Sequence, residues 1–119
     1  MSLYDAHRLF SWIVVGSNGL AGLWVLAGHW VDAVRHRTMW WFVGAAQATI
    51  AIQVILGVVV RQVDSREASG LHMFYGFIAF ATVGIIYSYR QQVEPWRHML
   101  FGLGGLFLMG LALRSMTLI

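Results

Sequence analysis

The sequence predicts an all-α fold: an integral membrane four-helix bundle with up-down-up-down connectivity. Of the 119 residues, 59% are hydrophobic and only 11% are charged, and four long stretches carry no charged side chain. The mean hydropathy of +0.67 is well above that of a soluble domain. Because a helix rises about 1.5 Å per residue, roughly 20 apolar residues cross a bilayer core of about 30 Å. Each of the four stretches is therefore a candidate membrane span.

Charged residues set the limits of the four predicted helices, which are residues 7–31, 38–62, 69–89 and 97–116. The first apolar stretch ends at Asp32, and the second lies between Arg37 and Arg61. The third is closed by Arg90. The fourth meets its first charge at Arg114, whose long side chain can reach the membrane interface.

Short connections join these helices, so each helix is expected to lie antiparallel to its neighbour. The last connection contains Glu94-Pro95, a signal for a turn or a helix start. Residues 1–119 are therefore predicted to be a single transmembrane domain with both termini on one side. The first apolar stretch lacks a preceding basic segment and is long enough to span, so we expect it to remain as a helix and not to be a cleaved signal peptide.

The composition excludes several classes of function. The chain contains no Cys, which excludes disulfides, thiolate-bound metals and thiol nucleophiles. Its eight Arg are dispersed among the connections, so the pI near 10.0 does not predict a nucleic-acid surface. No Asp, Glu or Arg lies near the centre of a predicted span, which argues against an ion pump or a proton channel. Histidine is the remaining source of site chemistry.

Polar side chains inside the apolar stretches are predicted to join helices by hydrogen bonds, because hydrocarbon offers them no other partner. They are Asn18, Gln47, Thr49 and Gln53. A quinone or proton path is the alternative interpretation of these residues. Glycines of the first and fourth helices are predicted to permit close helix contact, namely Gly16, Gly19, Gly22, Gly102, Gly104 and Gly105.

Two histidines form the predicted site. His7 opens the first helix and His72 opens the third, and because these helices run in the same direction, both imidazoles are expected at the same depth. Such a pair can hold a metal or a heme iron between two helices. Ser11 and Gly76 each lie four residues beyond one histidine, on the same helix face, and leave room for a macrocycle. His7 and His72 are therefore the predicted metal ligands.

Arginines near these histidines are predicted to bind heme propionates. Arg8 follows the first histidine, and Arg61 and Arg66 precede the second. The alternative is that both histidines only bond headgroups or loop carbonyls at the interface. A zinc site is disfavoured, because its further ligands would have to come from an incomplete set, Asp5, Asp64 and Glu67.

Arginine counts do not settle the orientation in the membrane, since four lie on each side of the predicted bundle. The other three histidines, His29, His36 and His98, lie on the side opposite the predicted site. They are expected to anchor the helices at the interface, with a second cofactor site as the alternative. Their added positive charge favours that side as cytoplasmic, which places both termini outside the cytoplasm in a bacterial plasma membrane.

The first eleven residues carry a family resemblance. Tyr4-Asp5-Ala6-His7-Arg8-Leu9-Phe10-Ser11 resembles the His-Arg helix start of heme A synthases, and residues 53–60 with Leu71-His72 are similar to their next two helices. Enzymes of that family have two four-helix halves, each with a histidine pair that holds a heme on the extracytoplasmic side. The resemblance covers the first three helices and extends to the fourth only in hydropathy. It implies that the chain is one half, with His7 and His72 as axial ligands and Arg8 near a propionate.

The chain departs from that family at a catalytic position. Catalytic halves carry a Glu three residues before the first His, where this sequence has Tyr4. Asp5 is offset by one residue, which rotates it about 100° around the helix. The Cys pair of many bacterial members is also absent. The chain thus resembles the half that keeps heme b as a cofactor, so no catalytic residue is predicted and an enzymatic role is disfavoured.

The sequence therefore predicts one heme b per chain, bound by two imidazoles, in a small membrane protein that carries heme or transfers electrons. Its expected partners are heme, the lipid bilayer, and a second copy or a larger respiratory or photosynthetic complex. Two alternatives stay open: a half-length heme A synthase acting as a dimer, and a cofactor-free accessory subunit. A chlorophyll-type pigment with one axial His is a further possibility for the same site.

Overall fold

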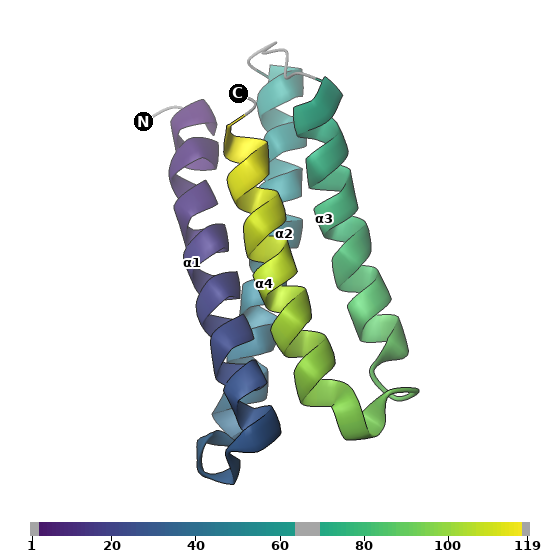
Figure 1. The fold of residues 1–119 in the computed structure, drawn as a ribbon. Helices are drawn as coiled ribbons and strands as arrows, with labels where there is room; N and C mark the ends of the chain where they lie inside the picture. Colours follow the sequence, from purple (N-terminus) through teal and green to yellow (C-terminus); the bar gives the residue numbers. More distant parts are fainter. Residues whose placement is uncertain (1–2, 64–69, 118–119) are drawn as a thin grey trace.

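The fold is all-helical throughout residues 3–63 and 70–117, which are the residues that the computed structural model describes. The four α-helices are α1 (Leu3–Trp30), α2 (Arg37–Val63), α3 (Gly70–Tyr89) and α4 (Arg97–Met116), and two short 3₁₀ helices, η1 (Asp32–Val34) and η2 (Glu94–Trp96), join them (Figure 1). Each α-helix is long and apolar enough to cross a membrane. The predicted all-α class is confirmed.

The helix ends agree with the sequence except at the start of α1. This helix begins at Leu3 and not at residue 7, because Tyr4, Asp5 and Ala6 contain no helix breaker and Asp5 suits the positive end of the helix dipole. His7 therefore lies in the second turn of α1. The predicted start of the third helix, residue 69, lies outside the described residues.

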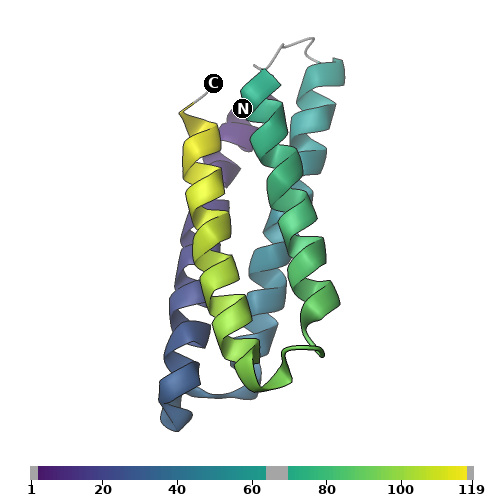
Figure 2. The same cartoon turned by 45° about the vertical axis from the view of Figure 1, so that its right-hand side comes forward.

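The four helices surround a common axis. Each contacts the next in the chain, and α4 returns to α1, against which it packs most extensively; α2 and α3 pack least extensively. Figure 1 shows both chain ends at one end of the bundle and the η1 and η2 connections at the other. The view in Figure 2 shows the same arrangement, with α3 turned toward the viewer. The starts of α1 and α3 therefore lie at the same end as the last turns of α2 and α4.

Close approach of α1 and α4 depends on glycine. A Cβ atom added to Gly22 would lie 2.9 Å from the carbonyl oxygen of Gly102, and one added to Gly105 would lie 2.9 Å from the Cα of Gly22. These are backbone contacts that no side-chain rotation can relieve. The predicted role of these three glycines is confirmed, whereas Gly16 has no atom within 4 Å of such a Cβ.

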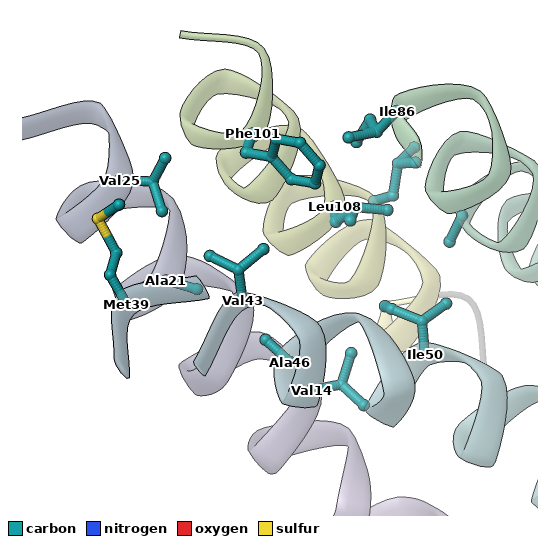
Figure 3. Close-up of a cluster of buried hydrophobic side chains, with 12 residues drawn as sticks. Val14, Ala21, Val25, Met39, Val43, Ala46, Ile50, Ile86, Phe101 and Leu108 are labelled. Carbon is teal, nitrogen blue, oxygen red and sulfur yellow. The ribbon is translucent and has the colours of Figure 1, made fainter. Parts of the chain in front are cut away.

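The core contains side chains from all four helices (Figure 3). Val25 of α1, Met39 of α2 and Leu108 of α4 are fully buried. Asn18 is also buried, and its amide nitrogen donates to the carbonyl oxygens of Val14 (2.9 Å) and Ala46 (3.1 Å). The second bond joins α1 to α2, as predicted for this residue.

Candidate functional site

A cavity of about 750 Å³ lies at the end of the bundle that carries both chain ends. All four helices line it, and most lining side chains are apolar. Its polar lining residues are Tyr4, His7, Ser11, Gln53, Arg61, Gln62, His72, Tyr75 and Ser115. Small-molecule sites of roughly 300–1,000 Å³ with an apolar wall and a few polar groups have this character.

His7 of α1 and His72 of α3 face each other at this cavity. Their ring centroids are 6.3 Å apart, and their planes form an angle of 88°. A metal between two imidazoles needs about 2 Å to each nitrogen, and each nitrogen lies about 1 Å from its ring centre, so the centroids must lie about 6 Å apart. The observed separation of 6.3 Å fits that distance, and it is also the separation of an edge-to-face contact between two rings.

Ser115, in the last turn of α4, orients the imidazole of His72. The Nδ1 atom of His72 lies 2.9 Å from the carbonyl oxygen of Ser115 and 2.8 Å from its hydroxyl oxygen. Because a carbonyl oxygen can only accept, Nδ1 carries the proton and the lone pair lies on Nε2. Metal-binding histidines commonly donate their second N–H to a carbonyl in this way. The hydrogen bond therefore selects the tautomer in which Nε2 can bind a metal.

Gln53 of α2 is the corresponding neighbour of His7. Its amide nitrogen donates to the carbonyl oxygen of His7 (2.7 Å) and to the hydroxyl of Ser11 (3.1 Å), and Ser11 in turn donates to the same carbonyl (3.1 Å). These bonds fix the orientation of the amide. Within the described ranges, the Oε1 atom of Gln53 and the Nδ1 atom of His7 are both buried without a hydrogen-bond partner.

These two atoms are complementary, since a protonated Nδ1 donates and Oε1 accepts. An unsatisfied buried polar atom costs about 1–3 kcal/mol, so a small movement that pairs them is favourable. That pairing would again leave the lone pair on Nε2. Gln53, which the sequence predicted to link helices, thus lies where it could also orient His7.

Glycines give the two histidines their space. A Cβ added to Gly57 would lie 3.1 Å from the Cε1 atom of His7, so the imidazole rests directly on the backbone of α2. Gly76 lines the cavity, and a Cβ there would meet no atom within 4 Å. The sequence pointed to Gly76 and missed Gly57, although Gly57 lies four residues after Gln53 on the same face of α2.

Of the two described arginines that were predicted to bind propionates, Arg61 lines the cavity and Arg8 does not. Arg8 is exposed and does not line the cavity; its guanidinium carbon lies 6.0 Å from the centre of the Tyr4 ring. Arg61 does line the cavity. Arg66 lies outside the described residues. Ser11 and Gly76 accompany the histidines in the lining, as the sequence suggested.

Within the part of the chain that the structure describes, no carboxylate joins the two histidines in a metal site. Asp5 is exposed, while Asp64 and Glu67 lie outside the described residues. Residues 3–63 and 70–117 contain no group of three or more His, Asp or Glu side chains that could hold a metal ion. Among the described residues, the imidazoles of His7 and His72 are thus the candidate metal donors at the cavity.

The histidines at the opposite end each contact a different side chain. The ring of His29 stacks on Trp96 with centroids 5.1 Å apart, and His98 lies against Trp40 at the same centroid distance. The Nδ1 atom of His36 lies 2.9 Å from the hydroxyl oxygen of Thr38. Contact with Trp suits the predicted interfacial anchoring of His29 and His98.

Comparisons with protein-family models, with curated proteins and with solved structures find no match to this chain. The assignment of the site accordingly rests on the geometry of its own residues.

Proposed function

We propose that this chain is a multi-pass membrane protein with up-down-up-down connectivity that binds one heme b between His7 and His72. The observation that carries the proposal is the separation of the two rings, 6.3 Å between centroids, at an apolar cavity of about 750 Å³. Two histidines that could both bind the iron and an apolar cavity for the ring are the features that support this proposal.

The residues around the pair support this fit. The carbonyl oxygen of Ser115 accepts from Nδ1 of His72, so the lone pair that could bind iron is the one on Nε2. Gln53 has an acceptor, Oε1, that can hold the corresponding proton of His7. The apolar walls from α2 and α3 would exclude water from the face of the ring. Ser115 and Gln53 would therefore hold both histidines in the tautomer that carries its proton on Nδ1.

Bound at this site, heme b would supply one-electron redox chemistry. His7 and His72 would both bind the iron, and the loss of a free position for O₂ would favour electron transfer over oxygenation. The described residues that line the cavity include no carboxylate. Tyr4 lines the cavity where catalytic halves of heme A synthases carry Glu, so oxidation of a heme methyl group lacks its expected acidic residue.

We further infer a bacterial plasma membrane location, with the heme end and both termini outside the cytoplasm. The opposite end carries three histidines, His29, His36 and His98, beside its four arginines, and this larger set of basic side chains supports the orientation. Large apolar side chains such as Trp41, Trp30 and Phe77 are more than 60% exposed, and lipid or a partner subunit would cover them. A second copy of the chain or a larger respiratory or photosynthetic complex is the proposed partner.

A reduced-minus-oxidised visible spectrum and a pyridine hemochrome assay of the purified protein test the proposal. We expect a b-type spectrum with about one heme per chain, which His7→Ala and His72→Ala each remove. His36→Ala is the matched control, because His36 is exposed at the opposite end of the bundle. A colourless wild-type protein after heme reconstitution, or equal heme content in all three variants, would overturn the assignment and favour an accessory subunit without cofactor.

A further inference from the structure

The cavity opens sideways between α2 and α3. Val58 of α2 and three residues of α3, Met73, Phe77 and Phe80, line the cavity and are also exposed at the protein surface, by 44% or more of each side chain. The opening lies between the two neighbouring helices that pack least against each other. Since both helices are candidate membrane spans, the opening would face the hydrocarbon of the bilayer.

Arg61 stands at this opening. It lies in the last turn of α2, and its Nη1 atom is 3.6 Å from the sulfur of Met73 on α3. A thioether is a weak acceptor, and the guanidinium group has five N–H donors. No carboxylate within residues 3–63 and 70–117 pairs with Arg61; the ion pair found there joins Arg35 to Asp32. Toward the described residues, the guanidinium of Arg61 therefore has N–H donors left to bind an anion.

We propose that Arg61 binds the carboxylates of a tetrapyrrole that enters sideways between α2 and α3. This inference rests on the proposed heme site, because heme has an apolar body with its two propionates on one edge. The planar fork of a guanidinium matches a carboxylate in geometry and charge. The ligand would lie with its apolar body against Phe77 and Phe80 and its carboxylates at the end of the cavity where Arg61 lies.

Arg8, which the family resemblance places near a propionate, is the matched control for this assignment. Arg8 lies at the same end of the bundle as Arg61 and carries the same charge. It is exposed, however, and does not line the cavity. Its guanidinium lies over Tyr4 and not over the opening between α2 and α3. Replacement of either arginine by Gln removes the same charge from the same end of the protein.

The test compares the affinities of detergent-purified protein for protoporphyrin IX and for its dimethyl ester, measured by fluorescence titration. These porphyrins contain no iron, so their binding does not require axial ligation by the histidines. We expect wild-type protein and Arg8→Gln to prefer the free acid by about tenfold or more, the factor that corresponds to one charge-assisted hydrogen bond. We expect Arg61→Gln to bind both porphyrins about equally, and Arg61→Lys to keep part of the preference.

Retention of the full preference in Arg61→Gln would overturn the inference, and so would a wild-type protein that binds both porphyrins equally or neither. Circular dichroism of each variant verifies that it is folded. A hemin titration of the same samples separates this inference from the proposed function. Acid preference that depends on Arg61, without a histidine-dependent hemin spectrum, would support the carboxylate site while rejecting iron ligation.

Discussion

Replacement of Gly105 by Ala tests the close contact of α1 with α4. The added Cβ would lie 2.9 Å from the Cα of Gly22 and 3.0 Å from the carbonyl oxygen of Asn18, whereas ordinary contacts begin at 3.4 Å. Both partners are backbone atoms, so the helices themselves must move apart by roughly half an ångström. A gap of about 0.5–1 Å forfeits a quarter to a half of the dispersion attraction between facing atoms. Overpacking of this kind costs about 1–3 kcal/mol.

Gly110→Ala is the matched control on the same helix. A Cβ at Gly110 meets no atom within 4 Å. Both substitutions gain the same helix propensity, about 1 kcal/mol for Gly to Ala, so this gain cancels when the two variants are compared. We therefore expect the free energy of unfolding of Gly105→Ala to lie about 1–3 kcal/mol below that of Gly110→Ala.

The assay is reversible unfolding in mixed micelles, with increasing SDS as the denaturant and far-UV circular dichroism as the signal. Equal unfolding free energies for the two variants, within about 0.5 kcal/mol, would refute the argument that glycine sets the distance between α1 and α4. Greater stability of Gly105→Ala than of Gly110→Ala would refute it more strongly: since the helix-propensity gain cancels, the added methyl group would then stabilise the contact between α1 and α4.

Two further substitutions probe the core and the site. We expect Asn18→Ala to lower the free energy of unfolding by about 1–3 kcal/mol in the same assay, because it removes the buried hydrogen bond to Ala46; an unchanged value would contradict this role. We expect Gly57→Val to lower the affinity for hemin by about tenfold or more in a spectral titration, because even the Cβ would press on the imidazole of His7. Gly84→Val, where a Cβ meets open space, is the control, and an equal loss in both variants would argue against the contact.

Much of the architecture could be predicted from the sequence. Charged residues mark where the apolar helices end, and the alternating direction of short-linked helices brings the starts of α1 and α3 to one end, where the rings of His7 and His72 lie 6.3 Å apart. Ser11 and Gly76 followed from helical periodicity alone, since each shares a helix face with its histidine. The spacing of residues along one helix was therefore enough to predict the neighbours of a histidine that lie on its own helix.

The partners from other helices could not be predicted in the same way. Ser115 and Gly57 reach the histidines from α4 and α2, and which face of those helices turns inward depends on their rotation about their own axes. A helix that is apolar on all sides carries little periodic signal for that rotation. Arg8 and Arg61 could not be told apart from the sequence for the same reason, because both lie at the same end of the bundle and only their positions around the helices differ.

The loose contact between α2 and α3 has a consequence for the lifetime of the protein in the cell. α3 contributes only Ala79 and Ile86 to the buried core within the described part of the chain, so it is held to the bundle less firmly than the other helices. A ligand bound by both α1 and α3 would hold α3 in the bundle. At a hundredfold excess over its Kd, it would raise the free energy of unfolding by about 2.7 kcal/mol. Empty protein would release α3 more often and be degraded sooner, so that supply of the ligand would itself set how much of the protein accumulates.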